Sequence, residues 1–236
     1  MPATPAATAA RHGHAVVIGG SMARLCAARI LADHFAGVTV VERDRLPEHP
    51  AIRKGVPQAR HVHVLLIGGL RALNRLFPGL EEELAAAGAQ QVDWFADFRT
   101  LGINGWLARY RSGIVMRTCS RAMLEWLIRR RLAANPAITF LTEHDALGLL
   151  ADPARERVTG VTIRPRGDRG VGEPRALHAD LIVDASGRDT RAPEWLRALG
   201  RGETDVTTIN AFLGYATRWY RPPADFRADW RALFIF

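Results

Sequence analysis

The chain has 236 residues, of which 48% are hydrophobic and 24% charged, a composition typical of ordinary globular proteins. This length allows one sizeable core, or one domain and part of another. The formal charge of +8 comes from 32 basic and 24 acidic residues, and every basic residue except Lys54 is an arginine. That skew indicates a GC-rich bacterial genome, and the arginines are scattered rather than gathered with aromatic residues. The composition therefore argues against a nucleic-acid-binding protein.

Other classes are excluded by what the sequence lacks. Residues 1–13 form a low-complexity Ala/Thr/Pro stretch, which we expect to be a disordered tail without the apolar core of a signal peptide. No apolar run approaches the ~18 residues that a membrane-spanning helix requires. Cys26 and Cys119 have neither metal-ligand spacing nor a disulfide framework. We expect a cytoplasmic protein without a metal site.

Residues 14–42 have the layout of a dinucleotide-binding βαβ unit. Residues 15–18 suit a buried parallel strand, Gly19 and Gly20 permit a tight turn, and Ser21 is suited to cap the helix that follows. A second strand over 38–41 ends at Glu42, whose carboxylate could accept the two hydroxyls of a ribose. The helix is expected to face the core with an apolar stripe at Met22, Leu25, Cys26, Leu31 and Phe35.

Arg24 departs from the dinucleotide fingerprint, because the third glycine of the pattern would stand at this position. That glycine normally lets helix and strand pack closely. Arg24 must point aside, widen the contact, or reach toward the pyrophosphate as a charged partner. Ser21 at the second glycine position is a milder change, since serine is small and its hydroxyl can donate to a phosphate.

The middle of the chain alternates irregular and helical segments. Residues 43–63 are rich in proline and charge and predict an irregular loop, either solvated or in contact with phosphate or other cofactor atoms. An aromatic segment follows over 90–118, which either fills a core or lines a substrate pocket. Helices are predicted over 64–77, 80–87 and 120–134, the last of them capped by Ser120.

Arg121 would lie in the first turn of the last of these helices, an unfavourable place for a cation. Either its side chain faces solvent, or a bound phosphate or acid compensates its positive charge.

The remaining pattern returns to strands. A parallel strand is predicted over 137–142, then a small antiparallel meander over 146–151, 157–164 and 176–178, and a buried strand over 181–183. A small-residue turn after this strand would let a cofactor approach closely. A helix is expected over 193–199. The alternation from Asp205 through residues 207–220 suggests the start of an antiparallel sheet, and residues 232–236 form an apolar strand that either joins an existing sheet or marks a truncated chain.

Taken in order, the segments VVIGGSMARL, VTVVERDRLP, RKGVPQARHVH, SRAMLEWLIRRRL and ADLIVDASGRDTR resemble the amino-terminal half of the FAD-dependent monooxygenase and halogenase-like superfamily. The resemblance implies an α/β fold with a Rossmann-like FAD/NAD(P)-binding domain over 14–203, including a substrate-pocket insertion over 90–118. The start of a substrate domain would follow over 204–236.

The resemblance also implies which residues hold the cofactor. The first glycine turn would contact the FAD pyrophosphate, Glu42 would bind the adenosine ribose, and the following loop would approach the flavin. The full set of expected cofactor-binding residues is Gly19, Gly20, Ser21, Met22, Glu42, Arg43, Arg53, Gln58, Arg121, Asp184 and Gly187. FAD would carry the redox chemistry, with NAD(P)H as reductant, and the chain would orient a small organic substrate.

Two departures from this superfamily keep alternatives open. Ser186 stands where aromatic hydroxylases carry an aspartate, a form found in members that take reduced flavin from a partner flavin reductase. No later Gly-Asp motif follows to hold the ribityl chain. An inactive nucleotide-binding remnant and an NAD-dependent reductase are therefore the alternatives to an FAD-dependent monooxygenase, and no catalytic side chain is identified.

Overall fold

The computed structural model describes residues 12–167 and 170–236, which form two compact units. The first comprises the described residues up to Glu48, together with 53–56 and 129–210; the second comprises 49–52, 57–128 and 211–236. This division differs from the expected boundaries of 14–203 and 204–236, because 57–128 and the C-terminal strand form a compact unit of their own. Residues 1–11 of the expected tail lie outside the described residues, and its last two belong to the first strand.

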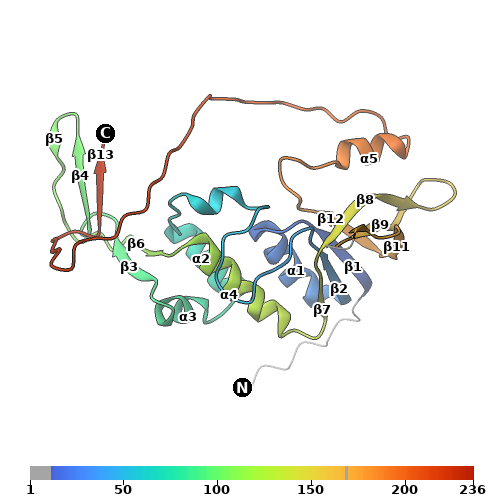
Figure 1. The fold of residues 1–236 in the computed structure, drawn as a ribbon, viewed down its shortest axis with the longest axis horizontal. Helices are drawn as coiled ribbons and strands as arrows, with labels where there is room; N and C mark the ends of the chain where they lie inside the picture. Colours follow the sequence, from blue (N-terminus) through green and yellow to red (C-terminus); the bar gives the residue numbers. More distant parts are fainter. Residues whose placement is uncertain (1–11, 168–169) are drawn as a thin grey trace, which may run out of the picture. The chain divides into compact units, whose positions relative to one another are not determined.

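A four-stranded parallel sheet organises the first unit, in the order β12-β1-β2-β7 (Figure 1). The expected strand–turn–helix–strand unit is present, and the expected strand over 137–142 extends the same sheet. The strands are β1 (His12–Ile18), β2 (Phe35–Val41), β7 (Ile138–Leu141) and β12 (Leu181–Asp184). Ile18 is in register with both Val41 and Asp184, so these strands end at one edge of the sheet.

Helix α1 (Met22–His34) packs beside β1 and β2 (Figure 1). Its buried face consists of Arg24, Leu25, Ala28 and Ala32. Of the expected stripe, Leu25 and Phe35 are buried, but Phe35 already begins β2, and Met22, Cys26 and Leu31 are only half-buried. The small alanines let the helix lie close to the sheet, which the wider stripe of large residues would not allow.

An antiparallel meander, as expected, covers part of the parallel sheet. β9 (Val158–Gly167) lies between β8 (His144–Ala151) and β11 (Arg175–His178), and the short β10 (Gly170–Val171) also pairs with β9. The tip of the expected turn, residues 168–169, lies outside the described residues. Helix α5 (Ala192–Ala198) adds Trp195 to the core. That core joins the parallel sheet to the meander through Val16, Ile18, Val41, Val161, Ile163, Ala179 and Trp195.

The second unit begins with short helical elements. These are η1 (Pro57–Arg60), α2 (Ile67–Leu76) and α3 (Leu80–Ala86), so the helix expected from residue 64 begins three residues later. β3 (Gln90–Asp93) and β6 (Val115–Thr118) form an antiparallel pair across the aromatic segment. Val92, Phe98 and Met116 are buried together, so part of that segment does fill a core.

Helix α4 (Arg121–Ala133) matches the expected helix closely. The Ser120 Oγ accepts a hydrogen bond from the Met123 N–H at 3.1 Å, which confirms the predicted cap. The four expected inward side chains, Leu124, Leu127, Ile128 and Leu132, are all buried.

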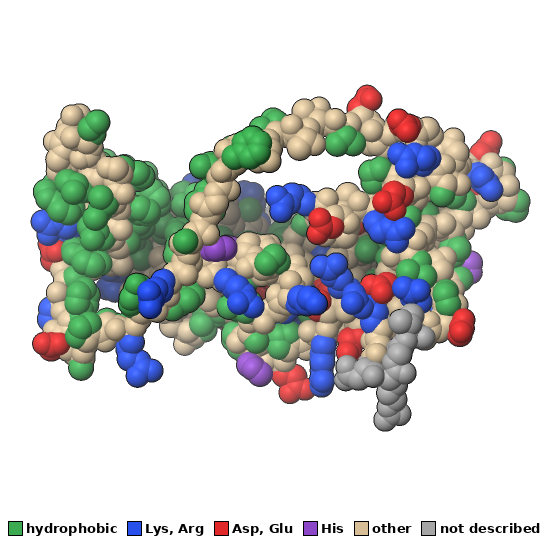
Figure 2. All heavy atoms as spheres, turned by 45° about the horizontal axis from the view of Figure 1, so that its top comes forward, with side chains coloured by type: hydrophobic (Ala, Val, Ile, Leu, Met, Phe, Trp, Pro, Cys, Tyr) green, Lys and Arg blue, Asp and Glu red, His purple; other side chains and the backbone are tan. Residues whose placement is uncertain are grey.

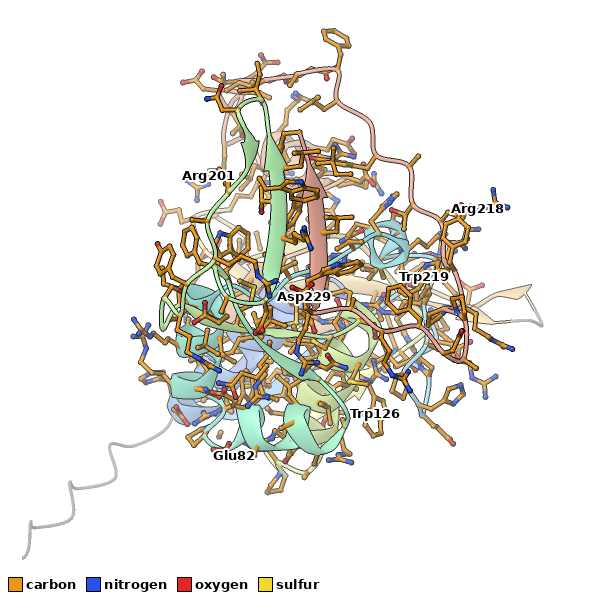
Figure 3. All side chains as sticks on the ribbon, turned by 90° about the vertical axis from the view of Figure 1, so that its left-hand side faces the viewer. Glu82, Trp126, Arg201, Arg218, Trp219 and Asp229 are labelled. Carbon is orange, nitrogen blue, oxygen red and sulfur yellow. The ribbon has the colours of Figure 1, made fainter. Side chains whose placement is uncertain are left out.

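The C-terminal part of the chain differs from expectation. Residues 201–229 contain no strand, and Ile209 and Phe212 are about nine-tenths exposed. The alternating pattern there fails to predict a sheet because a strand requires a neighbour to pair with. Residues Ala232–Ile235 do form a strand, β13, which pairs in parallel with β4 (Phe98–Gly102), beside β5 (Gly105–Trp106). Figure 3 shows β13 and β4 side by side, with Asp229 near the start of β13, where its carboxylate accepts a bond from Arg109 at 2.7 Å.

Candidate functional site

A cavity of about 310 Å³ opens in the first unit where β1 and β2 end. Parallel sheets commonly bind ligands at this carboxyl edge. The cavity volume is at the lower end of the ~300–1,000 Å³ range of ligand pockets. Of the expected cofactor-binding residues, it is lined by Gly19, Gly20, Glu42, Arg43 and Arg53.

The first glycine turn is packed too tightly for any side chain. Gly19 has φ +122°, and a Cβ there would lie 2.3 Å from the Ala185 carbonyl oxygen. A Cβ on Gly20 would lie 1.7 Å from Glu42 Oε2. Gly19 is therefore required by its positive φ and by the backbone beside it, whereas a side chain at Gly20 would have to displace the Glu42 and Arg53 side chains.

Ser21 is the N-cap residue of α1, with an extended backbone, but its side chain makes no capping hydrogen bond. The expectation of a Ser21 cap was wrong. At this N-terminus the helix dipole still favours an anion.

Glu42 lies at the centre of a buried ionic network. Its Oε2 accepts a hydrogen bond from Arg24 Nη1 at 2.8 Å and another from Arg53 Nη1 at 3.1 Å. Its Oε1 accepts the Asp44 N–H at 2.9 Å. Arg24 is 0% exposed and Glu42 only 2% exposed, so the pair is shielded from water. Arg24 is thus a charged partner, as one alternative held, but its observed partner is Glu42, which none of the three alternatives named.

Asp44 extends this network to the loop that follows. Its Oδ2 accepts hydrogen bonds from Arg53 Nη1 at 3.2 Å and from the Gly55 N–H at 2.8 Å. Arg53 is thus held against Glu42 and Asp44. Asp44 was not singled out in the sequence, although its position two residues after the strand-terminal acid is a usable signal.

The second turn lies beside the first. The Ala185 N–H donates to the Ile18 carbonyl at 2.8 Å, joining the ends of β12 and β1. Asp184 organises the turn, since its carboxylate accepts bonds from the Ser186 N–H at 2.9 Å and from the Thr190 hydroxyl. Gly187 has φ +94° and open space around it. The structure therefore brings both predicted cofactor turns together, and Ser186 lines the same cavity.

Six of the eleven predicted residues are not among those that line this cavity: Ser21, Met22, Gln58, Arg121, Asp184 and Gly187. Met22 is the first residue of α1. Gln58 is exposed in η1, and Arg121 is in α4, both within the second unit. Arg121 Nε donates to Glu125 Oε1 at 2.8 Å, so a carboxylate of its own helix already relieves the unfavourable charge at the helix start.

Several residues that line the cavity were not predicted from the sequence. His144 and Asp145 reach it from the start of β8, and Arg164 from β9. Trp195 of α5 is 6% exposed and lines it as well. Only the folding of the meander onto the sheet brings these residues to the site, and no local motif marks them.

The aromatic segment lines a second cavity, of about 270 Å³, within the second unit. Phe98 and Phe234 stack there with ring centroids 5.0 Å apart. The lining is mostly apolar and consists of Trp94, Phe95, Phe98, Thr100, Leu107, Ala108, Phe234 and Phe236.

Within residues 12–167 and 170–236, no three His, Cys, Asp or Glu side chains gather as a metal site would require. No helix in the described part of the chain has the length and apolar character needed to cross a membrane. On the face drawn in Figure 2, basic side chains (blue) and acidic side chains (red) are interspersed.

Comparison with known proteins gives one related sequence and several related folds. No family model matches the chain. Protein Rv3254 of Mycobacterium tuberculosis is 38% identical over 222 residues, which cover 89% of this chain and 45% of that protein. The chain thus spans less than half the length of this curated relative.

Several solved structures that resemble the chain are described as flavin-dependent enzymes. The myxobacterial chondrochloren halogenase CndH, an FAD-dependent halogenase, matches 76% of this chain and 38% of its own, at 22% identity and a TM-score of 0.57. PqsL of Pseudomonas aeruginosa, described as a probable FAD-dependent monooxygenase, matches 82% and 47%, at 18% identity and a TM-score of 0.58. The p-nitrophenol 4-monooxygenase PnpA of Pseudomonas putida matches 78% and 44%, at 19% identity and a TM-score of 0.55. The chain therefore has the fold of the FAD-dependent monooxygenases and halogenases, as the resemblance in its sequence implied.

Proposed function

We propose that this chain binds FAD and provides the cofactor-holding part of an FAD-dependent oxidoreductase, with monooxygenation of a small organic substrate as its reaction. One observation carries the proposal. The glycine turn after β1, the acid after β2 and the turn after β12 all meet at one edge of a parallel sheet, and residues from all three line one cavity.

The residues at this edge fit a dinucleotide. Gly19 and Gly20 leave the backbone bare where a Cβ would meet other atoms, and α1 begins immediately after them. A helix N-terminus favours a pyrophosphate, and a strand-terminal carboxylate suits ribose hydroxyls. We assign the pyrophosphate to Gly19, Gly20, Ser21 and Met22, and the ribose to Glu42.

The remaining lining residues supply charge and shape. Arg43 is exposed at the cavity and is suited to a phosphate, whereas Arg53 orients Glu42 and Asp44. Asp184 and Gly187 shape the second turn for close approach of the cofactor. When bound, FAD would supply the redox chemistry, and the role of the chain is to hold it, orient it and exclude water.

The finer parts of the proposal concern reductant, substrate and compartment. We propose NAD(P)H as the source of electrons, used directly or through a partner flavin reductase, since the resembling folds include both monooxygenases and halogenases. The aromatic cavity of the second unit favours a flat, apolar substrate. A cytoplasmic setting fits the two free cysteines, Cys26 and Cys119.

Flavin retention tests the proposal directly. We expect the purified chain to keep, or take up, FAD through a desalting column, measured by its visible absorbance and by quenching of protein fluorescence. Gly20→Ala should weaken FAD binding at least tenfold, because its Cβ would displace the Glu42 carboxylate. The matched control is Gly148→Ala in β8, where a Cβ meets nothing within 4 Å and FAD affinity should be unchanged.

Three results separate the alternatives. A folded chain that takes up no FAD contradicts the proposal. A chain that binds FAD but shows no substrate-dependent NAD(P)H oxidation, with or without a flavin reductase, supports the cofactor-binding module without activity of its own. Turnover with oxygen consumption supports the monooxygenase.

A further inference from the structure

The carboxylate of Glu42 has little hydrogen-bonding capacity left. A carboxylate offers about four lone-pair positions, two on each oxygen. Arg24 Nη1 and Arg53 Nη1 take both positions on Oε2, and the Asp44 N–H takes one on Oε1. One acceptor position remains, whereas reading both hydroxyls of a ribose would need two.

Arg24 reaches this carboxylate from behind the site. It is fully buried and is not among the residues that line the cavity, whereas Glu42 is. Arg24 therefore acts on a ligand only through Glu42. The third-glycine position of the turn, where a side chain is usually absent, here supplies a guanidinium that fixes the acid at the end of the neighbouring strand.

Oppositely charged groups face one another in this network. Two guanidinium groups, of Arg24 and Arg53, face the carboxylates of Glu42 and Asp44 at 2.8–3.2 Å. Buried ions of this kind are held firmly, because removing one partner leaves another charge uncompensated in a water-poor environment. A ligand hydroxyl therefore cannot readily displace Arg24 from Oε2.

We propose that Arg24 is a positioning and specificity-determining residue: its buried ion pair with Glu42 leaves one acceptor, so that the site reads a single hydroxyl of the adenosine ribose. The inference rests on the proposed function, since it concerns how that cofactor would be recognised. It predicts that removing one ribose hydroxyl weakens binding much more than removing the other. Two free acceptor positions on Glu42 would not produce this asymmetry.

Calorimetric titration of the wild-type chain with ADP, 2′-deoxy-ADP and 3′-deoxy-ADP tests the asymmetry without any substitution. Loss of the hydroxyl that donates to Glu42 should weaken binding about tenfold or more, as expected for a hydrogen bond to a charged group. Loss of the other hydroxyl should change the affinity less than about threefold. Equal losses for the two deoxy compounds would overturn the inference and leave the proposed function standing.

Substitution of Arg24 tests its role. In Arg24→Gly and Arg24→Met, the Glu42 carboxylate loses the partner that fixes it and can turn a second acceptor position toward the cavity, so both deoxy analogues should now bind about tenfold more weakly than ADP. The control is Arg29→Met on the same helix, whose partner is Asp33 rather than Glu42, and it should keep the wild-type asymmetry. An unchanged asymmetry in both Arg24 variants would contradict the inference.

The ion pair between Arg24 and Glu42 can also be tested without nucleotide, by measuring stability. Arg24→Met and Glu42→Gln should have strongly non-additive effects on the urea midpoint of unfolding, whereas Arg29→Met and Glu42→Gln should be additive. Additive effects for the first pair would contradict a positioning role.

Two further outcomes are decisive. If only the Arg24 variants bind ADP, then Arg24 closes the site and the inference is wrong. If neither wild type nor variants bind ADP or FAD while remaining folded, the proposed function fails and this inference with it.

Discussion

Asp93 shows how one side chain can fasten a loop in the second unit. Its carboxylate accepts hydrogen bonds from the backbone N–H groups of Phe95, Ala96, Ser112 and Gly113, and from the Ser112 hydroxyl. Partial burial raises the pKa of Asp93, but these hydrogen bonds outweigh it and hold the pKa well below its usual value. The ionised form is thus the one that the fold stabilises.

A pH dependence follows from this lowered pKa. Since the folded-state pKa lies below the unfolded value of about 3.9, Asp93 adds stability above about pH 4 that is lost as the pH falls toward the folded-state pKa. We expect Asp93→Asn to lower the free energy of unfolding at neutral pH and to remove part of the acid sensitivity below pH ~4. Urea titrations between acid and neutral pH measure both. The exposed Asp225→Asn serves as the control, and an acid dependence identical to wild type in Asp93→Asn would contradict the assignment.

At the residue scale, the sequence indicated the glycine turn, Glu42 and the second turn, because each follows a recognisable strand. It could not indicate that Arg24 and Arg53 share one oxygen of Glu42, since that depends on how α1 and the following loop fold back. His144, Arg164 and Trp195 were missed for the same reason. Long-range packing, not local pattern, assembles that part of the site.

Among the elements, those with strong local signals were predicted best. Helix α4 has a cap, a regular apolar face and an Asn-Pro end, and its predicted bounds differ from the observed ones by one residue at each end. The buried face of α1 was predicted poorly because the helix contacts the sheet through alanines, to which a hydrophobic pattern gives little weight. The strand predicted within residues 207–220 is absent from this part of the described chain, since alternation alone does not supply a pairing partner.

The Ser120 cap of α4 should contribute measurably to the free energy of unfolding. Ser120→Ala removes the acceptor for the Met123 N–H, and we expect the free energy of unfolding to fall by about 1 kcal/mol. Ser120→Asp should restore it, because aspartate is an equally good cap and also favours the positive end of the helix dipole. Chemical denaturation of the three proteins would show this order. A Ser120→Asp protein no more stable than Ser120→Ala would argue that the hydroxyl matters for another reason.

For the molecule as a whole, ligand binding should stabilise the first unit more than the second. All residues of the proposed cofactor cavity belong to the first unit. A ligand at 100 times its Kd stabilises the part that binds it by about 2.7 kcal/mol. We therefore expect added FAD to slow amide hydrogen exchange around residues 18–21, 42–44 and 184–187, with little change in β3 and β6. Uniform protection, or protection confined to the aromatic cavity, would place the nucleotide elsewhere.

The parallel pairing of β13 with β4 has a consequence for synthesis on the ribosome. β4 leaves the exit tunnel early, but Ala232–Ile235 emerge only after α4, the last strands of the parallel sheet and the whole meander have been made. During that time one edge of β4 has no partner, and Phe98 and Trp94 lack the Phe234 ring against which they later lie. The first unit can complete its own core meanwhile, so nascent chains should acquire structure out of sequence order. We expect the second unit to be the part that depends most on chaperones while translation is under way.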